Sequence, residues 1–420
     1  MTTTTLTLSI ITVVLLQLFG FSLLGLWRSR MAFHRQDEEG QKFQPSTVAI
    51  GSDEPSALSG WSGFKEFRVE RKVYENLDRS ICSLYLKPVD GVPLSMFRPG
   101  QFLTFRLEIV NPATGDAEQL IRCYSLSDAP GRDTYRVSIK RVAAPADRPE
   151  LSAGRSSSYF HDQVEAGDRL AVRAPSGHFF LQPDEPLPVV LIAGGIGITP
   201  MLSMLTHLLE GGSKREVWLF YGVRNGDEVA MAGLLRKLAE SHSNFHFHLS
   251  YSAPLDSDRE GVDFQHAGRI DLQLLRNTLP LQRHQFYVCG PRPMMESLVP
   301  GLEEWGVALA DIFYESFGPA SLIRPRQTAP AEGSASTPLI TFSQSGRQVT
   351  WDPAVGSLLE FAEANAIEVT YGCRAGSCGA CQTRLSDGEI EYSQHPDADL
   401  EPGHCLLCIS RPKGNITLEA

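Results

Sequence analysis

The sequence predicts a multidomain protein with an N-terminal transmembrane helix, an antiparallel β-barrel, an α/β doubly wound domain and a C-terminal α+β domain of the β-grasp type. Three observations carry this prediction. Residues 5–27 are uncharged and mostly apolar, short alternating strands begin near Phe64, and a glycine-rich turn near Gly194 joins a buried strand to a helix. The predicted segments are a transmembrane anchor (1–28), a tether (29–62), the barrel (63–184), the doubly wound domain (185–320), a linker (321–337) and the C-terminal domain (338–420).

Composition limits the classes of partner. The chain has 420 residues and a formal net charge of −11, which argues against a nucleic acid as its ligand. Its eight cysteines include no spacing typical of a disulfide framework. We therefore expect a reducing compartment.

The apolar run at residues 5–27 has the length of a membrane span, for which about 20 residues suffice. No Lys or Arg precedes it and no small-residue cleavage site follows, so a cleaved signal peptide is disfavoured. Arg28, Arg30 and Arg35 follow directly. Because basic residues stay on the cytoplasmic side, we expect a single-pass membrane protein whose soluble domains are cytoplasmic.

The barrel prediction rests on five short runs of alternating apolar and polar residues separated by turn residues. Within this region stands Arg122-Cys123-Tyr124-Ser125. A guanidinium can neutralise a phosphate, an aromatic face can support a planar ring, and a hydroxyl can donate to a ring nitrogen. The five predicted strands are Phe67–Val73, Ile81–Leu86, Phe102–Ile109, Tyr135–Lys140 and Leu170–Val172.

The doubly wound domain opens with a buried-strand run at residues 188–193, which leads into the glycine turn at residues 194–200 and then a helical pattern. Such a turn lets a pyrophosphate approach backbone N–H groups at a helix N-terminus. Pro200 stands where the dehydrogenase fingerprint has its third glycine. A second strand run ends in Cys289-Gly290-Pro291, and Glu315-Ser316-Phe317-Gly318 closes the region.

The C-terminal domain contains Cys373, Cys378 and Cys381 at C-x4-C-x2-C spacing, with Cys405 and Cys408 in a later apolar segment. This is the plant-type [2Fe–2S] spacing, whereas zinc sites usually pair C-x2-C units. The intervening glycines let a loop wrap closely and direct N–H groups at sulfur. Cys408 is the preferred fourth ligand, and Cys405 is its rival.

Taken in order, the motifs R-x-Y-S, G-G-x-G-x-T-P, C-G-P-x-P-M and E-x-F-G resemble those of the ferredoxin–NADP reductase superfamily. The resemblance covers about residues 64–420. It is greatest to the reductase part of flavohaemoglobins and to reductases of the phthalate-dioxygenase-reductase type, which carry a C-terminal ferredoxin. It implies a flavin-binding barrel, an NAD(P)-binding domain and a [2Fe–2S] ferredoxin domain. The predicted anchor departs from the soluble members of that group.

The resemblance also implies roles for individual residues. Arg122 would neutralise the flavin phosphate, Tyr124 would stack on the isoalloxazine, and Ser125 would lie near flavin N5. Contacts to the ribityl chain or pyrophosphate would come from Val137, Ile139, Lys140, Ser157 and Ser158.

In the second domain, Thr199 and Cys289 would border the nicotinamide. Phe317 would cover the flavin, and Glu315 would lie at its reactive edge, so the groups beside the reacting atoms are Ser125, Cys289 and Glu315. The remaining dinucleotide contacts would come from Gly194, Gly195, Gly197, Gly290 and Pro291. The ending of residues 407–410 resembles the last-cysteine strand of plant-type ferredoxins, which favours Cys408 as ligand.

The expected function is that of a membrane-anchored NAD(P)H-dependent electron-transfer oxidoreductase. Hydride would pass from NADH to flavin, and single electrons would pass through the [2Fe–2S] cluster to a terminal oxygenase, hydroxylase or desaturase. FAD is expected, with FMN as the alternative; NADH is expected, although Arg224 could bind the 2′-phosphate of NADPH. The alternative function is a stand-alone oxidoreductase that reduces a small molecule or quinone directly.

Acidic residues gather near the end of the chain, and they form either a solvated face or a docking patch for a basic electron acceptor. If they form a docking patch, charge reversal at Asp397 and Asp399 should slow electron delivery and leave NADH oxidation by artificial dyes intact. An unchanged rate to the true acceptor contradicts the docking patch. The residues concerned are Asp387, Glu389, Glu391, Asp397, Asp399 and Glu401.

Overall fold

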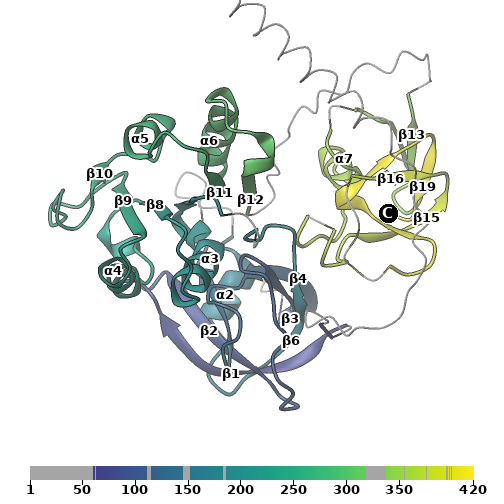
Figure 1. The fold of residues 1–420 in the computed structure, drawn as a ribbon. Coiled ribbons are helices and arrows are strands. Elements are labelled where there is room, and N and C mark those ends of the chain that lie inside the picture. Colours follow the sequence, from purple (N-terminus) through teal and green to yellow (C-terminus); the bar gives the residue numbers. More distant parts are fainter. Residues whose placement is uncertain are drawn as a thin grey trace, which may run out of the picture. The chain divides into compact units, whose positions relative to one another are not determined.

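The computed structural model describes residues 60–61, 63–110, 115–144, 152–182, 186–317, 337–353, 355–374, 376–393, 396, 398 and 400–420. The predicted anchor, almost all of the tether, most of the linker, Asp397 and Asp399 lie outside these ranges. The described residues from Gly60 onward belong to one unit by their contacts, and Figure 1 shows the elements they form. Within the described ranges, no helix is long and apolar enough to cross a membrane.

The first module is an antiparallel sheet in the order β4-β3-β6-β1-β2-β5, and a bridge between Leu126 and Val137 links its two outer strands. The predicted barrel is therefore confirmed. Two elements were missing from the prediction: the R-x-Y-S motif lies on a strand of its own, β4, and a short helix, α2, follows β5. The elements are β1 (Lys65–Tyr74), β2 (Ile81–Pro88), β3 (Phe102–Val110), β4 (Ala117–Ser125), β5 (Tyr135–Lys140), α2 (Arg155–Asp162) and β6 (Arg169–Ser176).

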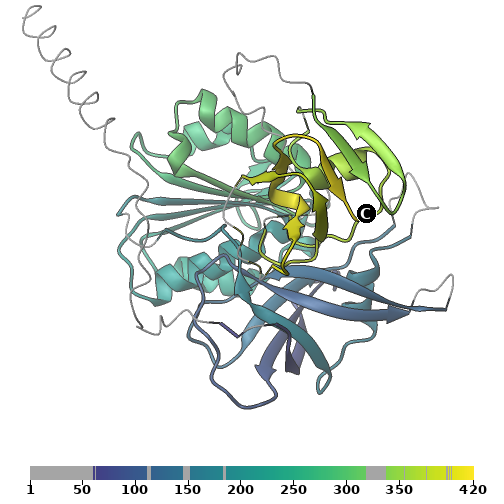
Figure 2. The ribbon, with the colours of Figure 1, turned by 90° about the vertical axis from the view of Figure 1, so that its right-hand side faces the viewer.

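The second module is a parallel sheet in the order β10-β9-β8-β7-β11-β12. Helices α3 and α4 pack on one face and α5 and α6 on the other (Figure 2). This confirms the doubly wound domain. The strands are β7 (Val189–Gly194), β8 (Val217–Val223), β9 (Phe245–Tyr251), β10 (His266–Ala267), β11 (Gln285–Gly290) and β12 (Ile312–Ser316); the helices are α3 (Ile198–Glu210), α4 (Ala232–Ser241), α5 (Leu272–Thr278) and α6 (Arg292–Glu304).

Chain order places the ligand crevice of this module. Strand β7 comes first in the sequence but lies in the middle of the sheet, between β8 and β11. The strand order therefore reverses beside β7, and a ligand binds at the carboxyl ends of strands at such a point. The glycine turn and the Cys289-Gly290 pair both lie at that edge.

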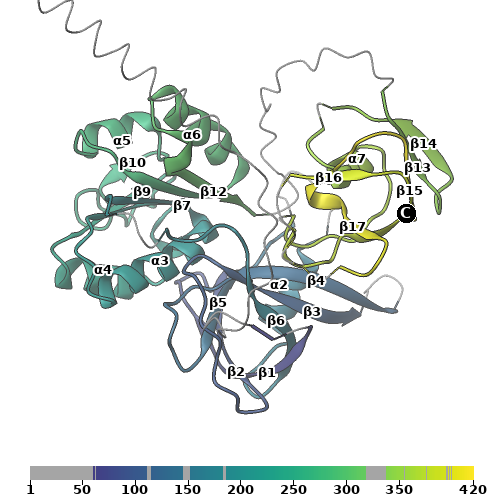
Figure 3. The ribbon, with the colours of Figure 1, turned by 45° about the vertical axis from the view of Figure 1, so that its right-hand side comes forward.

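The third module is a mixed sheet in the order β14-β13-β19-β15-β17, with a small β16-β18 pair and, among its described residues, one α-helix, α7 (Figure 3). The predicted hairpin of β13 and β14 is confirmed, and β13 runs parallel to β19, as a β-grasp requires. Ser357 caps α7 by accepting a hydrogen bond from the Glu360 N–H at 3.3 Å. The elements are β13 (Leu339–Phe342), β14 (Arg347–Thr350), α7 (Leu358–Ala364), β15 (Gln382–Asp387), β16 (Ile390–Tyr392), β17 (His404–Leu406), β18 (Ser410–Pro412) and β19 (Ile416–Leu418).

Candidate functional site

The four predicted cluster cysteines lie in two pairs. A side-chain hydrogen bond joins the thiols of Cys373 and Cys378, and another joins those of Cys381 and Cys408. Among the described residues, no three His, Cys, Asp or Glu side chains are grouped as a site for a metal ion. Two thiol pairs suit a binuclear cluster, because four thiolates are shared between its two irons.

Backbone N–H groups point at these sulfur atoms. Cys373 Sγ accepts from the N–H groups of Ser377 and Cys378, each at 3.3 Å, and Cys408 Sγ accepts from Gly376 at 3.3 Å. Left-handed backbone conformations at Arg374, Gly376 and Gly379 turn the loop around the sulfur atoms. Such donors stabilise the negative charge that a thiolate-bound cluster carries. The donor set therefore fits the predicted [2Fe–2S] group.

Cys405 belongs to neither pair, because its thiol hydrogen-bonds to Ser410 and Cys381 acts on it only through its charge. It is 1% exposed and packs in the hydrophobic core of the third module. Burial raises the pKa of its thiol to about 12. The structure therefore brings Cys408, and not Cys405, to the other three cysteines.

Strand β4 presents different residues to its two faces. Arg122 and Tyr124 stand opposite Phe105 and Leu103 of β3, whose side chains belong to the barrel core. Cys123 therefore points to the opposite face, because successive residues of a strand alternate. The ring of Tyr124 packs edge-on against Phe105, with 5.8 Å between centroids. Strand β4 can therefore present Tyr124 to a planar ligand on one face and the Cys123 thiol to the opposite face.

Several other residues predicted to contact the flavin have side chains that are buried or already paired within the chain. Val137 and Ile139 are fully buried in the barrel core, so any contact with a ribityl chain would come from their backbone atoms. Lys140 lies 3.2 Å from Glu228 of the second module. Ser157 Oγ donates to the Gly154 carbonyl at 2.9 Å and so helps to start α2.

Arg155, at the start of α2, is a candidate phosphate-binding residue that the motifs did not reveal. Its Nη1 donates to Glu118 at 2.6 Å. Its Nε and Nη2 are buried and have no hydrogen-bond partner within the described ranges. Buried guanidinium donors without an acceptor are costly, and a phosphate would satisfy them. The site therefore fits a flavin phosphate or pyrophosphate.

The glycine turn and the Cys289-Gly290 pair approach each other more closely than side chains would allow. A Cβ atom at Gly197 would stand 2.1 Å from the Cys289 carbonyl oxygen, and one at Gly290 would stand 3.1 Å from Gly194 Cα. Gly195 adopts a φ of +53°. Helix α3 begins at this turn with no side-chain cap, although the N–H of its first residue, Ile198, donates to the Gly195 and Ile196 carbonyls and Pro200 has no N–H.

Two further predicted residues frame this turn. The Thr199 hydroxyl donates to the Ile196 carbonyl at 3.0 Å, which ties the first turn of α3 to the glycine loop. Pro291 caps the N-terminus of α6 in an extended conformation. Both residues shape the backbone edge at which a nicotinamide would lie.

Glu315, on β12, is the residue at which the three modules meet. Its carboxyl group hydrogen-bonds to Ser125 of the barrel, lies beside Cys289 and lies near Cys373 of the cluster loop. Its Oε2 is buried without a hydrogen-bond partner among the described residues. Burial raises the pKa of Glu315 to about 8. Burial and the Glu315 charge also raise the pKa of Cys289 well above its ordinary value.

Phe317, predicted to cover a flavin, is 40% exposed.

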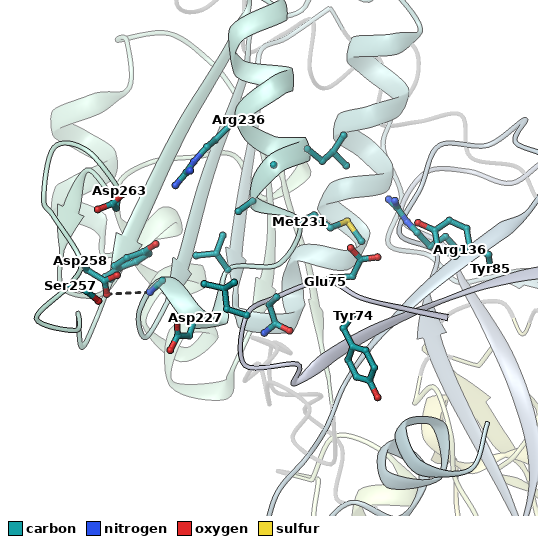
Figure 4. A pocket seen from close by; sticks show the side chains of 18 residues that line it. Tyr74, Glu75, Tyr85, Arg136, Asp227, Met231, Arg236, Ser257, Asp258 and Asp263 are labelled. Atoms are coloured by element: carbon teal, nitrogen blue, oxygen red, sulfur yellow. Dashed lines mark hydrogen bonds between the residues drawn. The ribbon is translucent and has the colours of Figure 1, made fainter. Parts of the chain in front are cut away.

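A separate cavity of about 790 Å³ lies between the β1–β2 turn and the loops that follow β8 and β9 (Figure 4). Its lining includes Asp227, Asp258 and Asp263, together with Arg136 of β5. None of the flavin or cluster residues predicted above line it.

Comparisons with known proteins agree with this division into modules. The family model for the oxidoreductase NAD-binding domain matches residues 191–299, and the model for the 2Fe-2S iron-sulfur cluster binding domain matches residues 340–413. The chain is 41% identical over 265 residues to the flavohemoprotein of Bacillus anthracis. That match covers 63% of this chain and 63% of the relative, so the chain spans less than two thirds of the curated relatives it matches.

Two solved structures are also similar. The flavohem-like FAD/NAD-binding domain of nitric oxide dioxygenase from Vibrio cholerae O1 biovar El Tor is 32% identical, with a TM-score of 0.53, over 61% of this chain and 100% of that one. Phthalate dioxygenase reductase, described as a modular structure for electron transfer from pyridine nucleotides to [2Fe–2S], is 26% identical with a TM-score of 0.50. The second match covers 85% of this chain and 98% of the other.

The thiol pairing predicts different outcomes for two neighbouring cysteines. Cys408→Ser should abolish the EPR signal of the reduced cluster or reduce the bound iron severalfold, because it removes one thiolate of a pair. Cys405→Ser should retain both signal and iron, since Cys405 belongs to neither pair. Iron analysis and low-temperature EPR of the purified variants test this. The reverse pattern would assign the ligand to Cys405.

Arg155→Gln should weaken flavin binding about 10- to 100-fold, because a hydrogen bond to a charged group is worth about 1.5–3 kcal/mol. Fluorescence titration of flavin-depleted protein measures this. Arg169→Gln, an exposed arginine of the same barrel paired with Glu66, is the matched control. Equal flavin affinity of the Arg155 variant and the control would exclude a phosphate contact.

Glu315 should make stability depend on pH. Its raised pKa means that the folded chain holds a proton between about pH 4.5 and pH 8 that the unfolded chain has lost. Stability should therefore fall as pH rises through this window. The free energy of unfolding of the wild type should fall relative to that of Glu315→Gln by at most about 5 kcal/mol across this window. The difference should become constant above about pH 8. The measurement is the melting temperature of both proteins from pH 5 to 9. If the difference between the two melting temperatures stayed constant over that range, this assignment would be contradicted.

Proposed function

Because the chain belongs to the ferredoxin–NADP reductase superfamily, as a FAD/NAD-binding reductase with a C-terminal 2Fe-2S domain, we propose that it transfers electrons from NADH to a protein acceptor. The acceptor is a terminal oxygenase, hydroxylase or desaturase. The observation that carries the proposal is the meeting of Ser125, Cys289 and Cys373 around one buried carboxyl group, that of Glu315.

The cofactor set is FAD, NADH and a [2Fe–2S] cluster. Bound flavin can accept two electrons with a hydride and release them singly, as a one-electron cluster requires. Arg155 and Arg122 would hold the flavin phosphates, and Tyr124 would support the ring. The glycine turn would hold the dinucleotide pyrophosphate against the N-terminus of α3. Cys373, Cys378, Cys381 and Cys408 would hold the cluster.

The chain's own groups supply orientation and electrostatics in this reaction. Ser125 offers a hydroxyl where the reacting ring edge would lie, and the buried Cys289 would form a small wall beside a bound nicotinamide. Below about pH 8 the Glu315 carboxyl group is neutral, so it can donate a proton in a hydrogen bond at that edge. Buried surroundings of this kind exclude water from the hydride transfer.

Preference for NADH over NADPH is supported by the charges at the carboxyl ends of β8 and β9. The cavity there is lined by four acidic groups, those of Glu75, Asp227, Asp258 and Asp263, and by two basic ones, those of Arg136 and Arg236. Arg224, the one basic group considered for a 2′-phosphate, lies 3.9 Å from Glu228. The excess of negative charge at this edge would repel a 2′-phosphate, whereas it would not repel a neutral ribose hydroxyl.

We also propose that residues 5–27 anchor the chain in a membrane with the three modules in the cytoplasm. The support is the length of the apolar run and the three arginines after it. The full chain should sediment with membranes and resist carbonate extraction, and a chain beginning at residue 60 should not. Recovery of the full chain in the soluble fraction would exclude the anchor.

An anaerobic titration with NADH, and separately with NADPH, tests the proposed function. Flavin absorbance should bleach and the EPR signal of a reduced [2Fe–2S] cluster should grow at lower concentrations of NADH than of NADPH. Flavin reduction with a silent cluster would contradict the electron relay. Steady turnover with a quinone or small molecule, without a second protein, would favour the stand-alone oxidoreductase.

A further inference from the structure

Cys123 occupies the variable position of the R-x-Y-S motif, and its thiol lies at the cluster loop. Side-chain hydrogen bonds join it to the thiols of both Cys373 and Cys378. Both partners are candidate ligands of the same iron. Cys123 is itself outside the ligand spacing, so it is a fifth thiol beside the cluster and comes from the flavin-binding barrel.

Other contacts hold the loop on this face of the barrel. Arg173 Nη1 of β6 donates to the Cys378 carbonyl at 3.0 Å. Ile121 Cγ2, two residues before Cys123, lies 3.4 Å from the Cβ position at Gly372. Thr104 Oγ1 of β3 lies 3.4 Å from Cys123 Sγ and fixes its position. The thiol contact is therefore one of several between the barrel and the loop.

Chemistry assigns the direction of the hydrogen bond. A cysteine that binds iron does so as a thiolate, so Cys373 and Cys378 lose their protons when the cluster is bound. Of the three sulfur atoms, only that of Cys123 then carries hydrogen, so toward the two thiolates it acts as the donor, with its single hydrogen shared between them. Reduction adds negative charge to the cluster, and a donor at its sulfur atoms stabilises the reduced form more than the oxidised form.

We propose that Cys123 is a positioning residue for electron transfer, whose S–H group donates to the sulfur ligands Cys373 and Cys378 and raises the reduction potential of the cluster. The inference rests on the proposed [2Fe–2S] function. One face of β4 carries Arg122 and Tyr124, the proposed flavin-binding residues. Through Cys123, the other face of the same strand would adjust the reduction potential of the cluster. The sequence of one strand therefore couples the two redox sites.

The test is a redox titration of the cluster in the intact protein, reduced with dithionite and followed by EPR. Cys123→Ala should lower the ratio of reduced to oxidised cluster at the wild-type midpoint about 3- to 10-fold, where tenfold corresponds to 59 mV for one electron. Cys123→Ser keeps a donor and should change the ratio less than twofold. Cys82→Ala removes a buried thiol in the barrel core and is the control, with no expected change.

Two results would overturn the proposal: equal potentials for Cys123→Ala and wild type, or equal losses for the Ala and Ser variants. If Cys123→Ala does not retain its cluster, Cys123→Val fills the space without a donor and takes its place. Thr104→Val keeps the thiol but removes the hydroxyl beside it, and should shift the ratio in the same direction by less. Dithionite reduces the cluster without NADH. The titration therefore tests the role of Cys123 even if the protein does not accept electrons from NADH.

Discussion

The buried carboxyl group of Glu315 is the interaction on which the site depends. A carboxyl group is held away from water only where neighbouring groups enclose it, and here the neighbours come from all three modules. Ser125 brings the flavin strand, Cys289 the dinucleotide edge and Cys373 the cluster loop. Electron transfer needs these three regions close together and dry, and the raised pKa of Glu315 follows from the same enclosure.

Close backbone packing fixes the geometry around that point. The turn after β7 approaches the end of β11 so closely that a larger residue at Gly197 would move the backbone, and one at Gly290 would meet Met294 Cε and the Gly194 backbone. The cluster loop is fixed in another way, by N–H groups that point at sulfur and by left-handed residues that turn the chain. Both loops are therefore shaped by contacts within the chain itself.

Much of this was predictable because motifs with strict steric needs leave strict sequence patterns. The glycine turn, the cysteine spacing and the R-x-Y-S motif all predicted the modules in which they lie. The alternation of β5 could also have shown that Val137 and Ile139 face the core. Arg155 was missed, because the burial of its Nε and Nη2 without a partner depends on tertiary packing around α2 and leaves no local sequence pattern. The burial of Glu315 depends on residues far apart in sequence, which no local pattern contains.

The central claim is that electrons reach the cluster through flavin within one molecule. Rapid mixing of the protein with NADH, with absorbance for flavin and freeze-quenched EPR for the cluster, tests it most directly. The account predicts that flavin is reduced first, and that the cluster signal follows with a rate constant independent of protein concentration. A cluster signal that rises with the protein concentration, or before flavin reduction, would contradict the account.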